Sequence, residues 1–376
     1  MTGNPADRAG ATLEIDLIGI AKNWRLLARR VEPAECAAVV KADAYGLGAA
    51  HVAPVLAAAG CQRFFVATIE EGITLRGVLP ASAEIAVLNG LVPACARDFA
   101  EFRLVPVLND PGQVADWQCA AARYGQGPAM LHLDTGMARL GLSIPEFDGL
   151  ADDLGRPGPI RWRALVSHLA CSDEAKHPLN NIQQERFAAA RRRLGDFPAS
   201  LAASSGIFLG PNFHFDFVRP GAALYGVNPR PGRPNPMRQI VKLKGRILQI
   251  REVDRGQSVG YGATHVMASP GRLATVAVGY ADGWLRSASQ RGSGRIGDGQ
   301  VPLLGRVSMD LVVFDVSGVD PSVARPGGFI QLLDEDYGVD AAAADAGTIG
   351  YEILTALGRR YHRIYCGAAR LMLKQC

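Results

Sequence analysis

The chain has 376 residues, of which 48% are hydrophobic and 20% are charged, and its formal net charge is +4. This balance is typical of globular proteins and excludes a largely disordered chain. No run of like charges reaches five residues, and no stretch approaches the ~18 apolar residues of a membrane span, so we expect no nucleic-acid partner and no membrane partner.

The cysteines and the N-terminus bear on the cell compartment. The seven cysteines are widely spaced and include no Cys-x-x-Cys pair, so the sequence predicts neither a disulfide framework nor a metal site. The first residues lack the apolar core of a signal peptide. We therefore expect a cytoplasmic protein with reduced thiols.

Eight short apolar runs of β-forming residues follow one another in the first part of the chain, and segments with helical spacing lie between most of them. This alternation indicates a parallel sheet covered on both faces, and eight units favour a closed (β/α)8 barrel over residues 12–230. A doubly wound open sheet is the alternative, although the first run lacks the Gly-x-Gly-x-x-Gly turn usual in such folds. The runs are 37–42, 63–68, 84–89, 103–109, 129–134, 164–169, 201–205 and 214–219.

The pattern changes after a proline-rich linker at 228–236. We expect a second, predominantly β domain over residues 237–376, with a helical stretch at 348–360. The opening of the chain is also β-like, so residues 1–15 could pair with this domain. The longer β-like segments of the second domain are 241–253, 272–280, 301–316 and 327–334.

In a (β/α)8 barrel the active site lies where the strands end. Several chemically capable side chains follow the ends of the predicted strands. Each has an ordinary explanation, such as a solvated lysine, a hydrogen-bonded core histidine, a structural ion pair or an Asx turn, but their convergence on one face favours an active site. They are Lys41, Tyr45, Asp134, Arg139, His168, Ser204, Ser205 and Arg219.

Lys41 is notable because only six of the 40 basic residues are lysines. It follows an apolar run, so its stem should lie at the barrel interior, where burial of an ammonium group is costly and lowers the pKa. Such a lysine suits Schiff-base chemistry. The glycines at 46, 48 and 221 could form ordinary turns, or could let backbone amides approach a phosphate.

A second group of candidates lies in the β domain. Tyr261 stands between two glycines, Tyr280 and Asp282 lie on a predicted turn, and Met309 with Asp310 precedes a strong strand. Ordinary hairpin and turn residues are the alternative explanation. Nothing in the sequence resembles a P-loop or a Ser-His-Asp elbow.

Seven segments together resemble the successive motifs of the alanine racemase family, in the same order and over nearly the whole chain. The stretch VVKADAYGLG at 39–48 is the most specific. The resemblance implies a (β/α)8 barrel that binds pyridoxal 5′-phosphate (PLP), a C-terminal β domain, a homodimer and the interconversion of L- and D-alanine. The segments are 38–49, 133–141, 218–226, 258–265, 276–284, 305–310 and 348–358.

The same resemblance assigns roles to individual residues. Lys41 is expected to hold PLP as a Schiff base and to act as one catalytic base, with Tyr261 from a second subunit as the other. Arg219, supported by His168, is expected to face the pyridine nitrogen. Arg139 and Met309 are the expected substrate-binding residues. The cofactor phosphate is expected to contact Tyr45, Ser204, Gly221, Ala222 and Tyr351.

The chain departs from the family pattern at several positions. Many members have a lysine, often carbamylated, where this chain has His132, so Arg139 must be oriented in another way. Ala203 replaces the usual asparagine before Ser204, and Ser205 could substitute for it. Ser308 replaces a common cysteine, and the gate tyrosine near the C-terminus is absent or displaced.

Other functions remain open at this stage. A racemase of the same fold with broad specificity, or one for serine or basic amino acids, would share these motifs. A basic amino-acid decarboxylase usually has an acidic residue at the pyridine nitrogen, and a non-catalytic PLP-binding protein is a single barrel, so both fit less well. The sequence does not separate a role in peptidoglycan synthesis from one in alanine catabolism.

Overall fold

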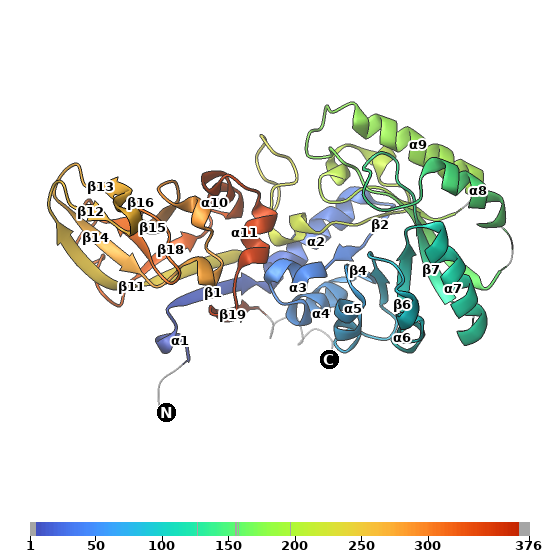
Figure 1. The fold of residues 1–376 in the computed structure, drawn as a ribbon, viewed down its shortest axis with the longest axis horizontal. Coiled ribbons are helices and arrows are strands. Elements are labelled where there is room, and N and C mark those ends of the chain that lie inside the picture. Colours follow the sequence, from blue (N-terminus) through green and yellow to red (C-terminus); the bar gives the residue numbers. More distant parts are fainter. Residues whose placement is uncertain (1–4, 126, 155, 157, 196, 368–376) are drawn as a thin grey trace.

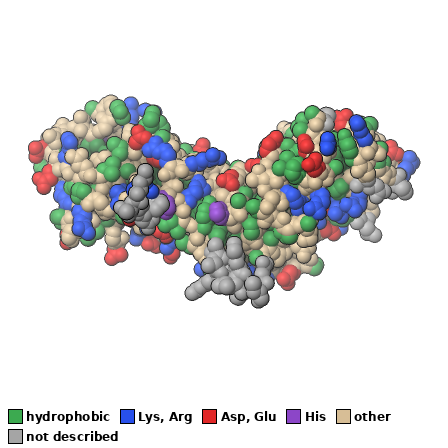
Figure 2. Space-filling model, turned by 90° about the horizontal axis from the view of Figure 1, so that it is seen from below, with side chains coloured by type: hydrophobic (Ala, Val, Ile, Leu, Met, Phe, Trp, Pro, Cys, Tyr) green, Lys and Arg blue, Asp and Glu red, His purple; other side chains and the backbone are tan. Residues whose placement is uncertain are grey.

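The computed structural model describes residues 5–367 except 126, 155, 157 and 196. It has two lobes, a barrel and a mostly β domain, joined by the first strand and by the segment after residue 226 (Figure 1). In the face that Figure 2 shows, acidic and basic side chains lie on both lobes. In the part of the chain described, no helix is long and apolar enough to cross a membrane.

The barrel strands are parallel. The sheet runs in the order β3-β4-β5-β6-β7-β8-β9, and β10 pairs in parallel with β2. Backbone bonds from Asp216 to Ala199 and from Arg219 to Ala202 join β9 to β10 and close the circle, which confirms the predicted barrel. The strands are β2 (Glu35–Cys36), β3 (Ala38–Val39), β4 (Arg63–Val66), β5 (Glu84–Val87), β6 (Leu104–Leu108), β7 (Gly127–His132), β8 (Ile160–Val166), β9 (Ala199–Ser200) and β10 (Phe217–Val218).

Helices cover the outside of the barrel and begin at sequence signals for a helix start. Asp16, Thr68 and Asp110 accept amide hydrogen bonds as N-caps of α2, α5 and α7. The helices are α2 (Leu17–Val31), α4 (Ala49–Ala59), α5 (Ile69–Arg76), α6 (Ala96–Glu101), α7 (Pro111–Tyr124), α8 (Ile144–Leu154) and α9 (Leu179–Leu194), and a 3-10 turn, η4 (Ala222–Tyr225), follows β10.

The second domain is built on a sheet in the order β14-β17-β16-β15-β18-β11-β1-β19. Strand β1 (Ala11–Asp16), from the start of the chain, lies between β11 and β19, antiparallel to the first and parallel to the second. The other elements are β11 (Val241–Val253), β12 (Ser258–Val259), β13 (His265–Val266), β14 (Gly271–Val276), β15 (Ser293–Ile296), β16 (Gly299–Leu304), β17 (Val312–Asp315), β18 (Phe329–Leu333), β19 (His362–Cys366), α1 (Pro5–Arg8), α10 (Val339–Ala346) and α11 (Gly350–Ala356).

Two predicted strands differ in detail. The run at 301–316 is interrupted by a loop because Gly305 takes a φ of +68°, where a Cβ would lie 2.8 Å from the carbonyl oxygen of Val259. The run at 201–205 is not a strand; β9 ends at Ser200, and only an isolated bridge joins Ala203 to Arg219.

Candidate active site

A cavity of about 730 Å³ opens at the carboxyl ends of the barrel strands. It brings together most of the side chains that the sequence places at strand ends, and it adds Tyr351 from α11. The predicted residues that line it are Lys41, Tyr45, Arg139, His168, Ser204, Arg219, Gly221, Ala222 and Tyr351, and His132, Ala203 and Ser205 line it as well.

The chain leaves β3 through a left-handed helical turn, residues 42–45, which begins immediately after Lys41. All four residues have φ between 53° and 56° and ψ between 41° and 51°. Non-glycine residues pay roughly 1–2 kcal/mol each for this conformation. Two carboxylates support it: Glu71 accepts a 2.6 Å hydrogen bond from the amide of Ala42, and Asp43 accepts one of 2.7 Å from Ala49.

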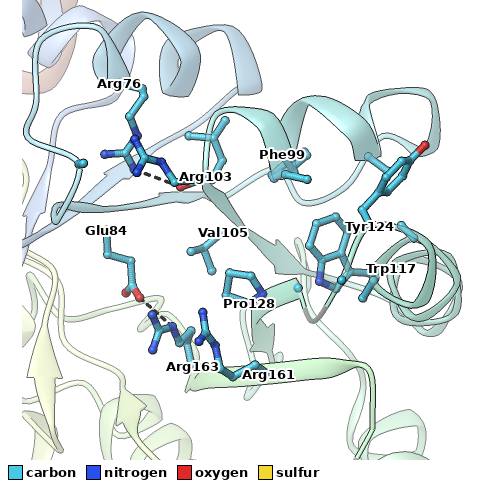
Figure 3. Close-up of a pocket in the computed structure, with 18 of the residues that line it drawn as sticks. Arg76, Glu84, Phe99, Arg103, Val105, Trp117, Tyr124, Pro128, Arg161 and Arg163 are labelled. Atoms are coloured by element: carbon cyan, nitrogen blue, oxygen red, sulfur yellow. Dashed lines mark hydrogen bonds and ion pairs between the residues drawn. The ribbon is translucent and has the colours of Figure 1, made fainter.

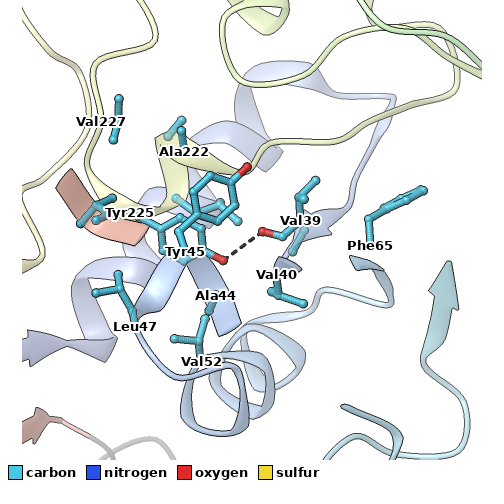
Figure 4. Close-up of a cluster of buried hydrophobic side chains, with 14 of the residues drawn as sticks. Val39, Val40, Ala44, Tyr45, Leu47, Val52, Phe65, Ala222, Tyr225 and Val227 are labelled. Atoms are coloured by element: carbon cyan, nitrogen blue, oxygen red, sulfur yellow. Dashed lines mark hydrogen bonds between the residues drawn. The ribbon is translucent and has the colours of Figure 1, made fainter. Parts of the chain in front are cut away.

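The left-handed turn packs on the end of η4 (Figure 4). The ring of Tyr45 lies 4.9 Å from that of Tyr225 and 6.0 Å from that of Tyr351, and the Tyr225 hydroxyl donates to the carbonyl oxygen of Val39. This packing directs Lys41 and Tyr45 into the same cavity. Burial lowers the pKa of Lys41, the charge of Arg139 lowers it further, and Glu71 opposes both effects.

Ser204 and the start of η4 form a polar corner of the cavity. The Ser204 hydroxyl oxygen accepts hydrogen bonds of 3.1 Å from the amide of Gly221 and 3.2 Å from that of Ala223, so its own proton remains free for an acceptor in the cavity. A Cβ on Gly221 would lie 2.3 Å from the hydroxyl oxygen of Tyr45. Only glycine permits this close approach of hydroxyl and backbone.

Arg219 is buried at the base of the cavity without a carboxylate partner among the described residues. Its Nη1 donates to the carbonyl oxygen and the hydroxyl of Ser200, at 2.8 Å and 2.6 Å, and its Nη2 donates to the carbonyl oxygen of Ser167. Burial lowers the pKa of Arg219 to about 10, which leaves the guanidinium charged at neutral pH.

Two histidines lie beside Arg219 and remain neutral. Burial, with Arg219 as the next cause, lowers the pKa of His168 to about 3 and that of His132 to about 4. His132 Nδ1 lies 2.7 Å from Asn109 Oδ1. The described hydrogen bonds do not include one between His168 and Arg219, whose guanidinium is held by Ser167 and Ser200 instead.

Tyr261 and Met309 do not line the cavity of their own chain. Tyr261 lies in a 3-10 turn between β12 and β13, far from the barrel in Figure 1, and is 72% exposed. Met309, in the loop between β16 and β17, is 54% exposed. Tyr280 is also exposed, whereas Asp282 is buried and pairs with Arg360 at 2.9 Å, which indicates a structural role for that carboxylate.

A second cavity, of about 370 Å³, lies where the barrel strands begin (Figure 3). Two of its polar side chains are engaged within the protein: Arg76 donates to four backbone carbonyl oxygens, and Glu84 pairs with Arg63 and Arg163. Residues at this end of a (β/α)8 barrel usually serve stability. In the described part of the chain, no group of three or more His, Cys, Asp or Glu is placed to hold a metal ion.

Sequence reasoning missed two residues that shape the site. Glu71 forms a capping box with Thr68 and also accepts a hydrogen bond from the amide of Ala42, and nothing in the sequence indicates this second contact. Asn109 directly follows strand β6, just as the other candidate residues follow their strands. Its position at a strand end could therefore have identified it as a site residue.

The chain matches two family models: the alanine racemase N-terminal domain over residues 15–229 and the C-terminal domain over residues 240–365. It is 52% identical to the alanine racemase of Rhodospirillum rubrum, over 96% of this chain and 97% of that protein. It is 46% identical to the catabolic alanine racemase of Mesorhizobium japonicum, over 98% and 97%. The crystal structure of Bartonella henselae alanine racemase with covalently bound pyridoxal phosphate superimposes with a TM-score of 0.91, at 40% identity and over 95% and 99% of the two chains. The chain therefore belongs to the alanine racemase family.

Proposed function

We propose that this protein is a PLP-dependent alanine racemase, which interconverts L- and D-alanine through two bases on opposite faces of the substrate. The observation that carries the proposal is the convergence of Lys41, Arg219 and the Ser204–Gly221 corner on one cavity, in a chain about half identical to a curated alanine racemase. We further propose that the barrel domain extends over 12–230 and the β domain over 237–376.

The residues present fit the cofactor. Tyr45, Ser204 and Tyr351 would hold the phosphate through their hydroxyl groups, and Gly221 and Ala222 would contact it through the backbone, where the Gly221 amide already donates to Ser204. Lys41, with its lowered pKa, would bond the aldehyde carbon, and Arg219, which has no carboxylate partner among the described residues, would face the ring nitrogen with His168 beside it. When bound, PLP acidifies the α-proton of the attached amino acid and accepts the charge that proton loss leaves.

Replacing Gly221 with alanine should weaken cofactor binding by roughly tenfold or more, because losing one or two charge-assisted hydrogen bonds costs about 1.5–3 kcal/mol. The new methyl group would occupy the position 2.3 Å from the Tyr45 hydroxyl and displace it. Titration of the apoprotein with PLP, followed by absorbance, measures the change. Gly149→Ala is the matched control, since a Cβ there meets nothing within 4 Å. Equal affinity in both variants would contradict the proposed phosphate corner.

Racemisation requires that one base removes the α-proton and another delivers a proton to the opposite face. Lys41 Nζ serves one face from within the cavity, and the lowering of its pKa by burial favours the neutral amine that a base requires. Tyr261 Oη serves the other. Because Tyr261 lies outside the cavity of its own chain, we propose that a second copy of this chain supplies it, in a homodimer with shared sites. In the family resemblance, the lysine acts on the D-form and the tyrosine on the L-form.

The substrate carboxylate needs donors in the same cavity. Arg139 lines the cavity and carries no hydrogen bond or ion pair to another described residue, so its guanidinium is available. We propose that Arg139 binds the carboxylate, together with the backbone amide of Met309 from the second copy.

The test is racemisation of L-alanine with added PLP, followed by chiral separation, in parallel with L-serine, L-lysine and L-arginine. Alanine should be interconverted fastest. An inert alanine beside a faster amino acid would replace the proposal with a racemase of broad or different specificity. Growth of a deletion strain with and without D-alanine then separates a peptidoglycan role from alanine catabolism, and either role places the enzyme in the cytoplasm.

A further inference from the structure

The inference concerns His132, the last residue of β7, which lines the cavity together with Arg139 and is hydrogen-bonded to a buried polar network. The network begins with Asn109, which is 4% exposed. Its Nδ2 donates to the carbonyl oxygens of Val107 and Leu88 at 2.9 Å and 3.1 Å. Rotating the amide by 180° would place Oδ1 against these two oxygens, so Oδ1 must face His132.

This orientation fixes the tautomer of His132. The Asn109 Oδ1 can only accept, so the His132 Nδ1 that lies 2.7 Å away must carry a proton and donate it. The main chain of Asn109 is fixed in turn, because its amide donates to Gln113 Oε1 at 3.0 Å. A neutral ring with its proton on Nδ1 presents an unprotonated Nε2, a hydrogen-bond acceptor, on its other side.

Arg139 lies in the loop that follows β7 and lines the cavity with His132. Asp134 accepts amide bonds from Gly136, Met137 and Ala138, and the amide of Leu142 donates to the carbonyl oxygen of His132. The carboxylate nearest in sequence to Arg139 is therefore occupied with forming the loop itself.

Arg139 lines the same cavity as Lys41, His132 and His168, and its charge lowers the pKa of each. Neither its guanidinium nor His132 Nε2 has a hydrogen-bond partner among the described residues. The Arg139 guanidinium therefore has free donors, His132 Nε2 is a free acceptor, and both residues line the same cavity.

We propose that His132 is a positioning residue that presents a neutral Nε2 to the Arg139 guanidinium, in a tautomer set by Asn109. This inference rests on the proposed racemase function, in which Arg139 binds the substrate carboxylate. A neutral acceptor orients the guanidinium and leaves its charge uncompensated, whereas a carboxylate at this place would neutralise it. Arg139 thus keeps its full effect on the substrate and on Lys41.

Two variants test the acceptor in different ways. His132→Phe removes Nε2 and keeps a planar ring, so the alanine KM should rise about tenfold with a smaller change in kcat, as expected for loss of one hydrogen bond to a charged group. Asn109→Asp keeps every atom of His132 but favours its charged form, so that Nε2 becomes a donor and repels Arg139. Because the new carboxylate also faces the carbonyl oxygens of Leu88 and Val107, which now accept from Asn109 Nδ2, the stability of this variant is measured in parallel. The charged groups that face His132 are Arg219, from the end of β10, and Asp134 and Arg139 in its own loop, with His168 from the end of β8 coupled to it.

The pH dependence separates these variants. In Asn109→Asp the KM defect should shrink as the pH rises and the imidazolium loses its proton, whereas in His132→Phe it should be constant with pH. Asn212→Asp introduces the same charge at an exposed barrel position and is the matched control. A KM unchanged in His132→Phe, or a pH-independent defect in Asn109→Asp, would overturn the proposal.

Two further measurements isolate the contact. The double variant His132→Phe, Arg139→Gln should have an alanine KM no higher than that of Arg139→Gln alone; effects that multiply would show that the two side chains act separately.

Nitrogen-15 NMR of the histidine-labelled holoenzyme reads the tautomer of His132 without any activity assay. The His132 Nε2 resonance should have the position of an unprotonated nitrogen and should move in Arg139→Gln. Failure of racemisation with this NMR result intact would reject the proposed function and leave the His132–Arg139 contact standing; a protonated Nε2 would reject the contact itself.

Discussion

Replacing Lys41 with alanine should abolish racemisation, with a loss of roughly 10³-fold or more, because under the proposed mechanism the variant would lack both the covalent attachment of PLP and one of the two bases. The visible absorbance band of the attached cofactor should disappear at the same time, although the Ser204 corner would still bind the phosphate. The measurements are chiral separation of the products and the absorbance spectrum. Lys176→Ala, at an exposed position, is the control and should retain both signals.

The same variant tests the shared site. Lys41→Ala and Tyr261→Phe should each be inactive, but mixing them should restore activity in heterodimers, since one of the two sites then has an intact lysine from one chain and an intact tyrosine from the other. This follows from the position of Tyr261, which is 72% exposed and absent from its own cavity. No recovery, once subunit exchange has been demonstrated, would mean that both bases come from one chain or that Tyr261 is not a base.

Replacing Arg219 with glutamate is expected to have the second largest effect. A guanidinium keeps its proton at neutral pH even with its pKa lowered to about 10, so at the proposed position it would donate a hydrogen bond to the ring nitrogen without protonating it. A carboxylate would hold a proton there and change the reactivity of the cofactor. Racemisation should fall roughly 10²-fold or more, and release of pyruvate from alanine, the mark of transamination, should increase.

The substitution also places a carboxylate against the carbonyl oxygens of Ser167 and Ser200, which now accept from Arg219, so stability must be measured in parallel. Arg219→Gln keeps donors for these oxygens and lacks both the positive charge and the acid. It should lose racemisation without gaining pyruvate release. Unchanged racemisation in a folded Arg219→Glu variant would show that the residue at the ring nitrogen does not control the reaction.

Most of the fold is predictable from the sequence because hydrophobic periodicity determines it. Strand β11 matches the prediction at both ends, since apolar residues alternate with Lys242, Lys244 and Arg246 over its buried half. Strand β9 was misplaced by two or more residues because Ala199 and Ser200 have weak β-propensity. Its position depends on pairing with Leu165 and Val166 of β8, which a linear pattern does not contain.

The candidate site was predictable as a set of positions but not as a geometry. The strand ends identified Lys41, His168 and Arg219. The left-handed turn was not foreseen, because Ala42 and Ala44 give no signal for positive φ; the turn depends on Glu71 from another element. Similarly, the tautomer of His132 depends on its hydrogen bond to Asn109, which lies 23 positions earlier in the sequence.

Strand β1 has a consequence for the order of events during synthesis. It is synthesised well before either of its partners, since Thr12 pairs with Lys244 on one side and with His362 on the other. Until both partners are made, Leu13 and Ile15, which are fully buried in the finished protein, belong to a strand with two open edges. Such edges recruit other chains, and contacts this distant in sequence form late. Glu14 and Asp16 alternate with the apolar residues, so the strand carries charges while it is unpaired. These charges disfavour pairing with other chains until β11 and β19 have been synthesised.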